Sequence, residues 1–275
     1  MYQFDPKNIE AFSKQIRKKI LDLSFYAGSS SSHFGGALSS ADIVAVLFGS
    51  IMNFNKNNFQ NPNRDRFILS KGHGCMVQYA ALNVLGIIPN EILKTFEKDE
   101  SDLLGHPVKN SKYGIDFSTG SLGMGLSIGI GLALAFKRKR MENRVFVIVG
   151  DGECNEGSIW ESALCAPNLN LNNLTVIVDH NNFQQTGSNK EIMDVSNLEK
   201  KWSSFNWKTH SVNGHEISEI TKILNSHDEK FPQAIIANTI KGKGFSFSEN
   251  NNDWHHKVMT KKNYDEALKE LNIND

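Results

Sequence analysis

Two strand-like segments, each ending in a polar turn, place the strongest constraint on what this chain can fold into. Residues 144–149 and 174–178 are rich in Val and Ile, and a third run of this kind covers residues 233–239. Segments with helical periodicity separate the three runs, which is typical of βαβ units. We therefore predict an α/β fold, in which a mostly parallel sheet is flanked by helices on both faces.

The same periodicity predicts where the helices lie. With 39% apolar residues, the 275-residue chain can bury a full core, and it shows no internal repeat and no long linker. Residues 1–275 are therefore expected to form a single domain. The expected helices cover residues 9–26, 40–52, 74–85, 122–140, 158–165, 215–225 and 264–271.

Composition argues against several classes of function. The 30 basic and 30 acidic residues cancel, so no net field attracts nucleic acid. The most apolar stretch, residues 126–136, has about half of the roughly 20 residues that a membrane span needs. The charged N-terminal segment lacks the apolar core of a secretory signal, and the three cysteines form no CxxC pair. We expect a cytoplasmic protein that binds neither nucleic acid nor a membrane.

The two polar turns predict a phosphate and metal site. Gly150-Asp151-Gly152 ends the first strand and leads into a helix that begins near Ser158. Open α/β sheets bind ligands at the carboxyl ends of their strands, and glycines before a helix N-terminus favour a diphosphate. A carboxylate beside phosphate requires a cation between them, and Mg²⁺ accepts such oxygen ligands. Asn181 follows the next strand, 30 residues after Asp151, so one helical crossover would bring the two turns together.

This pair of turns resembles a known cofactor motif. An isolated Gly-Asp-Gly is most often an ordinary turn, but one followed about 30 residues later by a strand-terminal Asn is similar to the thiamine diphosphate motif. The sequence contains no GxGxxG after a strand and no GxxxxGK[ST], which removes the competing nucleotide motifs. The resemblance implies that Asp151, Asn181 and the backbone carbonyl of Phe183 bind a divalent metal, Mg²⁺ or another such as Ca²⁺ or Mn²⁺.

Four histidines lie in segments rich in Gly or Ser, at His33, His73, His106 and His255. Loop histidines beside glycine can reach a ligand, although a lone one is more often structural. In order, their segments resemble the SGHPG, LSxGHG and GHP motifs and the late histidine loop of the transketolase family. Residues 118–125 resemble the family's TTGPLGQG segment. The resemblance therefore extends over nearly the whole chain.

The resemblance implies roles for particular residues. His33, His106 and His255 would hydrogen-bond the hydroxyls at the reacting end of a ketose and pass protons, because an imidazole titrates near neutral pH. Phe34 stands where the family has Pro, and His256 where many of its members have Gly, so the resemblance supports the cofactor residues but does not define the shape of the substrate. The residues expected to contact the cofactor are His73, Gly120, Ser121, Leu122, Gly152, Glu156, Asn181 and His255.

By this resemblance the chain is the N-terminal, diphosphate-binding subunit of a thiamine diphosphate-dependent transketolase. Such an enzyme moves a two-carbon ketol unit from a ketose to an aldehyde, and the cofactor carries the unit between them. The family's activating glutamate belongs to a pyrimidine-binding domain that normally follows this one. We expect that domain on a separate, C-terminal-type transketolase subunit, in a heterotetramer. Lys71, within LSKGHG, either helps to hold anionic groups or is a solvated loop lysine.

Two other functions are compatible with part of the pattern. The corresponding subunit of another thiamine diphosphate enzyme, such as a 2-oxoacid dehydrogenase or decarboxylase, would share the metal motif. A non-catalytic, cofactor-binding assembly subunit would tolerate the loss of the substrate histidines. The presence of His33, His106 and His255 in one chain favours the transketolase.

Overall fold

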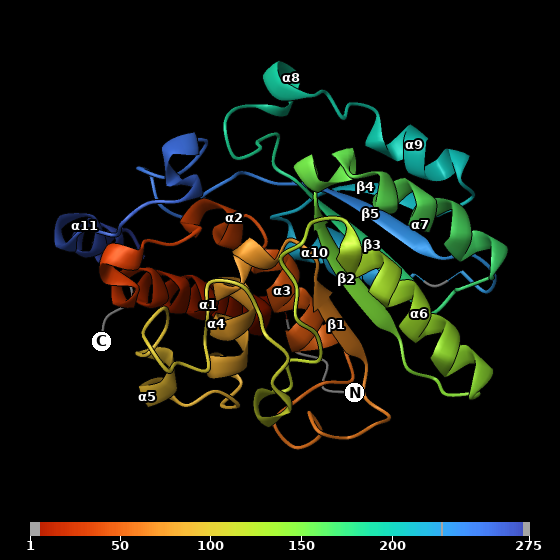
Figure 1. The fold of residues 1–275 in the computed structure, drawn as a ribbon, viewed down its shortest axis with the longest axis horizontal. Helices are drawn as coiled ribbons and strands as arrows, with labels where there is room; N and C mark the ends of the chain where they lie inside the picture. Colours follow the sequence, from red (N-terminus) through yellow and green to blue (C-terminus); the bar gives the residue numbers. More distant parts are fainter. Residues whose placement is uncertain (1–5, 227, 272–275) are drawn as a thin grey trace.

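A five-stranded sheet forms the centre of the protein (Figure 1), and all of its neighbouring strands run parallel. The computed structural model describes residues 6–226 and 228–271. The strand order is β1-β2-β3-β5-β4, so the chain passes from β3 to the edge strand β4 and returns to place β5 between them. The strands are β1 (Arg66–Leu69), β2 (Val145–Gly150), β3 (Leu174–His180), β4 (Lys208–Asn213) and β5 (Gln233–Asn238).

Helices cover both faces of this sheet, as predicted. The principal helices lie within about four residues of the expected bounds. Among the described residues, no helix is both long enough and apolar enough to cross a membrane. The α-helices are α1 (Pro6–Tyr26), α2 (Phe34–Leu38), α3 (Ala41–Val46), α4 (Met76–Val84), α5 (Asn90–Leu93), α6 (Met124–Arg138), α7 (Gly157–Asn168), α8 (Asn189–Ile192), α9 (Leu198–Ser204), α10 (Ile217–Asn225) and α11 (Lys261–Leu271).

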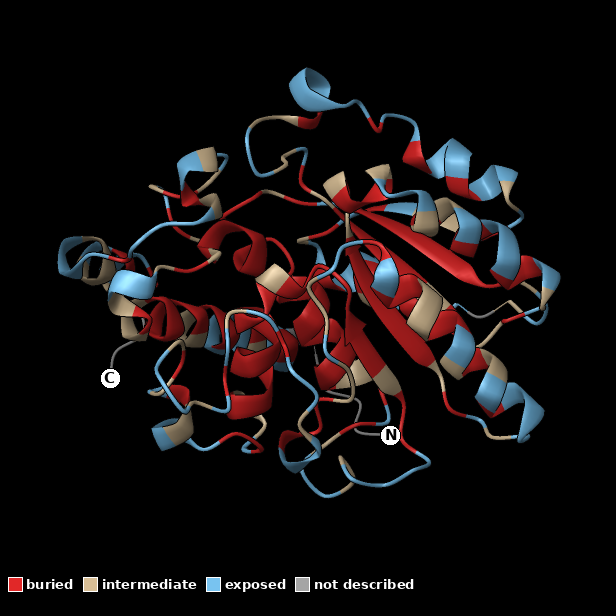
Figure 2. Cartoon of the chain, in the orientation of Figure 1, coloured by how far each residue is buried: buried red, intermediate tan, exposed pale blue. Residues whose placement is uncertain are grey.

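Alternation along β2 divides the core into two layers. Phe146 and Ile148 point to the face that is covered by α1, α3, α4 and α10. Val145, Val147 and Val149 point to the opposite face and pack with α6, α7 and α9. Figure 2 shows the sheet buried between these layers, whereas the outer surfaces of the helices are exposed. Burial on both faces explains why the central strands are continuous apolar runs without a polar alternation.

The carboxyl ends of β1, β2, β3 and β5 meet at one edge of the sheet. The register pairs Gly150 of β2 with Asp179 of β3, and Asp179 with Ala237 of β5. The polar turns that follow these strands therefore lie side by side, although they are far apart in the sequence. This edge is where an open parallel sheet binds ligands.

Three features of the fold differ from the expectations. The expected helix over residues 40–52 is split, because α3 is followed by a π-helical turn at Leu47–Ile51. Strand β1 was not anticipated, since it has only four residues and runs directly into the LSKGHG motif, whose first residue, Leu69, ends it. Strand β4 was also not anticipated. Most of its residues are polar and at least partly exposed at the sheet edge, so it lacks the apolar signal of a central strand.

Two glycines on α6 allow a direct test of how this helix packs on the sheet. A methyl group at Gly129 would lie 2.7 Å from Cγ2 of Val147, whereas one at Gly131 would meet nothing within 4 Å. We expect Gly129→Ala to lower the free energy of unfolding by about 1–3 kcal/mol through overpacking. Gly131→Ala should raise it by about 0.5–1 kcal/mol, because alanine favours the helix. Urea unfolding followed by circular dichroism measures both, and equal shifts would contradict the packing.

Candidate active site

A cavity of about 400 Å³ lies at the carboxyl edge of the sheet, and the polar turns form its walls. The loops after β1, β2, β3 and β5 contribute to it, together with the loop before α2, the loop before α6 and the 3₁₀ turn at Asn252–His255. Nearly all the predicted site residues meet here. Those that line the cavity are His33, His73, His106, Gly120, Leu122, Asp151, Gly152, Glu156, Asn181, Phe183 and His255.

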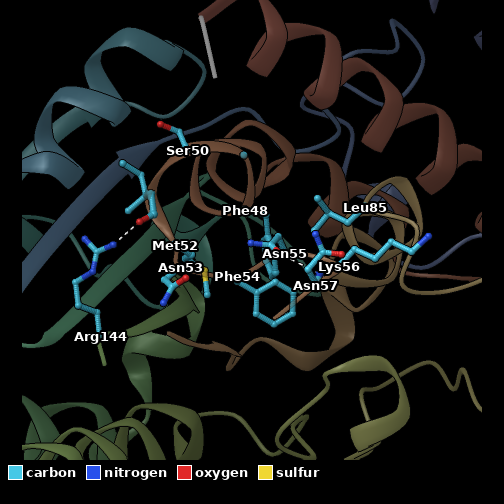
Figure 3. A pocket seen from close by; sticks show the side chains of 12 residues that line it. Phe48, Ser50, Met52, Asn53, Phe54, Asn55, Lys56, Asn57, Leu85 and Arg144 are labelled. Atoms are coloured by element: carbon cyan, nitrogen blue, oxygen red, sulfur yellow. Dashed lines mark hydrogen bonds between the residues drawn. The ribbon is translucent and has the colours of Figure 1, made fainter. Parts of the chain in front are cut away.

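A larger cavity of about 580 Å³ lies elsewhere, beside Arg144 at the start of β2 (Figure 3). Its described lining is mainly apolar and amide side chains, including Phe48, Met52 and Phe54, with the cations Lys56 and Arg144 at its ends. Neither a carboxylate nor a histidine is among these lining residues. Because it lies at the amino ends of the strands and lacks acid–base groups, we place the chemistry in the smaller cavity.

Asp151 and Asn181 follow the ends of the paired strands β2 and β3, and both line the cavity. The Asp151 carboxylate accepts hydrogen bonds from the backbone N–H of Gly152 at 2.8 Å and of Asn182 at 2.6 Å. The Asn181 amide oxygen accepts from the backbone N–H of Phe183 at 3.0 Å. The bond from Asn182 ties the two turns together, and the two local bonds orient the oxygens of Asp151 and Asn181.

The Asp151 carboxylate is only 1% exposed, and no described cation forms an ion pair with it. Burial, with the nearby charge of Asp179, raises the pKa of Asp151 to about 6. A buried carboxylate in this state gains stability from a cation. Among residues 6–226 and 228–271, no three His, Cys, Asp or Glu side chains converge to hold a metal by themselves. A metal at Asp151 would therefore take further oxygens from an amide, a carbonyl and a ligand.

Lys71 is a buried structural cation, neither solvated nor free in a loop. It is 1% exposed, forms an ion pair with Asp179 and donates a hydrogen bond to the carbonyl of Gly36 at 2.6 Å. Burial alone would raise the pKa of Asp179, but the Lys71 ammonium holds it below its usual value. Of the two interpretations of Lys71, the solvated one is wrong. Lys71 also lines the cavity, so its charge lies near any anion bound there.

The four predicted histidines form one cluster. The ring of His33 lies 5.3 Å from that of His73, 5.8 Å from that of His106 and 5.4 Å from that of His255. Burial and the neighbouring His256 lower the pKa of His33 to about 4, and burial with Lys241 lowers the pKa of His255 to about 3. Both imidazoles are therefore neutral near pH 7, so each can donate one hydrogen bond and accept another.

The glycine-containing turn before α6 closes one side of the cavity. Gly120 has a φ of 138°, and its backbone packs so closely on Gly72 that a side chain at position 72 would lie 2.7 Å from the nitrogen of Gly120. Gly120 and Leu122 line the main cavity. Ser121 does not; it faces a separate, smaller hollow beside Met124.

Two residues that the sequence reasoning missed organise the site. Glu153 is buried and accepts hydrogen bonds from the backbone N–H of Gly123 at 2.8 Å and of Gly150 at 3.0 Å, so it joins two cavity turns. Lys241 donates to His255 Nδ1 at 2.9 Å and lines the cavity. Burial, together with the like charge of Lys71, lowers the pKa of Lys241 to about 8. The sequence feature that could have indicated Lys241 as a site residue is its position three residues beyond the carboxyl end of β5.

Fold and site together define a thiamine diphosphate-binding α/β domain, and comparison with known proteins supports this class. Residues 11–275 match the family model described as "Transketolase, thiamine diphosphate binding domain". The chain therefore belongs to the transketolase family, as its thiamine diphosphate-binding part. The prediction of a transketolase-type enzyme subunit is confirmed.

Individual relatives include both single subunits of transketolases and longer enzymes. The chain is 38% identical to one named subunit of the apulose-4-phosphate transketolase of Actinobacillus succinogenes, with 98% of each chain covered. It is 39% identical to "6-deoxy-6-sulfo-D-fructose transketolase subunit SqwG" of Clostridium sp., with 87% of this chain and 88% of the relative covered. The transketolase structure from Leishmania mexicana superimposes with a TM-score of 0.86 at 26% identity, over 98% of this chain. This chain spans only 42% of the length of that protein.

The state of the histidine cluster is testable by NMR. His33 and His255 should stay neutral as the pH falls from 8 to 5.5, because burial disfavours their charged forms. Between pH 6.5 and about 4 the unfolded chain would bind a proton at His33 while the folded chain does not, so stability should decrease as the pH falls through this window. Imidazole ¹⁵N shifts, assigned with His33→Asn and His255→Asn, measure this. Protonation midpoints between pH 6 and 7 would contradict it.

Proposed function

We propose that this chain provides the diphosphate- and metal-binding half of an active site that transfers a two-carbon ketol unit from a ketose to an aldehyde. The observation that carries this proposal is the meeting, in one cavity, of the Asp151–Asn181 turns with the histidine cluster. The turns can hold a metal and a diphosphate, and the histidines can hold sugar hydroxyls. A 2-oxoacid-processing relative would need groups for a carboxylate at the place where this chain has neutral imidazoles.

The donor set fits a hard divalent metal, which we propose to be Mg²⁺, with Ca²⁺ or Mn²⁺ as alternatives. Asp151 is a buried carboxylate without a described cationic partner, and the oxygen of Asn181 and the carbonyl of Phe183 are the proposed protein ligands beside it. One carboxylate balances only part of a divalent charge. The remaining charge and ligands would come from the diphosphate of the cofactor.

The cofactor would lie with its diphosphate against Gly152 and Asn181. A Cβ at Gly152 would lie 2.9 Å from Cγ of Gln184, which also lines the cavity, so this wall has no room for a side chain at position 152. Lys71 and Lys241 provide positive charge at the same cavity. The remaining residues that we propose to contact the cofactor are His73, Gly120, Leu122, Glu156 and His255, whereas Ser121 faces the neighbouring hollow.

Thiamine diphosphate, when bound, supplies a nucleophile for the ketose carbonyl and an electron sink for cleavage of the adjacent carbon–carbon bond. His33, His106 and His255 would hold the sugar hydroxyls and transfer protons as carbonyl oxygens are formed and consumed. The neutral imidazole of His33 suits this task because it has one N–H and one lone pair. Because Lys241 donates to Nδ1 of His255 at 2.9 Å, Nε2 is the ring nitrogen that remains free to contact a ligand.

We propose that residues 1–275 form a single diphosphate-binding domain and that a pyrimidine-binding domain is on a separate chain. In support, the chain covers 98% of a relative that is named as one transketolase subunit, but only about 41% of single-chain transketolases. Leu122 and Met124 expose 38% and 50% of their surfaces at the α6 end of the cavity, where a partner can cover them. A cytoplasmic heterotetramer is the assembly that we expect.

The metal site can be tested by one substitution. Asp151→Asn should weaken Mg²⁺-dependent binding of thiamine diphosphate by at least about 100-fold, because it removes the charged metal ligand. Isothermal titration of the chain, purified with its companion, measures the affinity. Asp194→Asn, at an exposed position, is the matched control and should bind as the wild type does. Equal affinities of Asp151→Asn and the control for thiamine diphosphate would contradict the assignment of Asp151 as a metal ligand.

The partner surface gives a second test. Met124→Asp should dissociate the companion chain, because it places a charge in an apolar contact. Ile192→Asp, at an equally exposed apolar residue on α8, should leave the complex intact. The mass of the tagged complex from native cells distinguishes these outcomes. A wild-type chain that purifies alone would contradict the split enzyme.

A further inference from the structure

A second, smaller cavity of about 130 Å³ lies directly behind the histidine cluster, and we call it the side chamber. It shares His33, His73 and His106 with the main cavity. Because these three residues line both spaces, a substrate held by them would border on both. The groups on its far wall lie outside the main cavity.

Glu97 forms part of that far wall in a constrained conformation. Its φ is 59°, a left-handed value that is unfavourable for a glutamate, and its backbone N–H donates to the carbonyl of Leu103 at 3.1 Å. The carboxylate lies over Gly105, where an added Cβ would be 2.0 Å from Oε1. Gly105 directly precedes His106. The backbone therefore holds this carboxylate next to a proposed catalytic histidine.

The Glu97 carboxylate is half-buried, and among residues 6–226 and 228–271 it makes no hydrogen bond or ion pair. A carboxylate that is kept in a cavity without a partner is costly unless something else hydrogen-bonds it. The two oxygens of an ionised carboxylate can each accept a hydrogen bond from a donor group. Because Glu97 lines the side chamber, its carboxylate can accept hydrogen bonds from a molecule that lies there.

His256 and Ser31 form the opposite wall. The His256 ring lies 4.4 Å from that of His33, and its Nε2 is 3.0 Å from Ser31 Oγ. Reciprocal backbone bonds between Ser32 and Lys257, at 3.2 and 3.1 Å, hold these two segments together. The wall thus presents a hydroxyl and an imidazole, both of which can hydrogen-bond a ligand.

The chemistry of the side chamber selects its ligand. Of its described lining residues none is Lys or Arg, so a phosphate or sulfonate would meet the Glu97 carboxylate without a counterion. A hydroxyl donates to a carboxylate and exchanges hydrogen bonds with Ser and His. Its volume equals about four water molecules at about 30 Å³ each, which suits a short hydroxylated carbon segment.

We propose that the side chamber binds the uncharged, hydroxyl-bearing part of the aldehyde, with Glu97 accepting hydrogen bonds from its hydroxyls. This inference rests on the proposed function, because the aldehyde that leaves the ketose and the aldehyde that replaces it occupy the same place. Glu97 is thus a specificity residue: it favours hydroxylated aldehydes and disfavours a negative charge beside His106. The two-carbon unit remains in the main cavity.

The test compares D-glyceraldehyde with propanal, its analogue without hydroxyls, as acceptors for the assembled complex. In Glu97→Gln, the preference in kcat/KM for D-glyceraldehyde should fall about tenfold, mainly through KM, because a charge-assisted acceptor is lost from binding. Glu100→Gln is the matched control, since Glu100 is exposed and has a similar φ of 61°. It should keep the wild-type preference.

An unchanged preference in Glu97→Gln would overturn the side chamber as a binding site while leaving the proposed ketol transfer intact. An equal loss for both aldehydes would also overturn it, because only the hydroxyls should depend on Glu97. If the wild-type complex transfers no ketol unit, the proposed function fails. Titration with ribitol, an unreactive polyol, then tests separately whether the side chamber binds hydroxyls. Ribitol should bind about tenfold more weakly to Glu97→Gln than to Glu100→Gln, and equal binding would overturn the proposal.

Discussion

The buried ion pair between Lys71 and Asp179 is the interaction on which the rest of the site depends. Lys71 follows β1 and Asp179 lies near the end of β3, so the pair joins two strands that are not neighbours in the sheet. Asp179 also accepts from Ser39 Oγ at 2.6 Å and from the hydroxyl of Thr239, which follows β5. Three strand ends and the segment after α2 therefore converge on one carboxylate. Removing one partner of such a pair generally costs about 3–5 kcal/mol.

This pairing also determines the electrostatics of the cavity. Because Asp179 is neutralised by Lys71, Asp151 is left without a described cation. Glu153, another buried carboxylate of the cavity, is instead hydrogen-bonded by Ser70 and by two backbone N–H groups. Lys241 adds a second positive charge on the side of His255. The part of the cavity beside Asp151 thus suits a metal bound to an anionic group, while the neutral imidazoles of His33 and His255 suit hydroxyls. One continuous space therefore presents two different chemistries to the two ends of a ligand.

The sequence predicted the parts of this arrangement that have a strong local signal. The strands β2, β3 and β5 are apolar runs, and their terminal turns contain the residue types that metals and phosphates require. The order of β4 and β5 could not be predicted, because β4 is polar and nothing local shows that the chain skips a position. Lys241 and Glu153 were missed for a similar reason. Their roles depend on contacts between turns that are distant in the sequence, and a lysine or glutamate in a turn is ordinarily solvated.

The central claim is that a metal and a diphosphate occupy the cavity between the ends of β2 and β3. A crystal structure of the chain with its companion, thiamine diphosphate and Mg²⁺ tests it most directly. The account predicts a metal about 2.1 Å from oxygens of Asp151, Asn181 and the Phe183 carbonyl, with the diphosphate against Gly152. Cofactor density in the cavity beside Arg144, or a metal without contact to Asp151, would contradict the account.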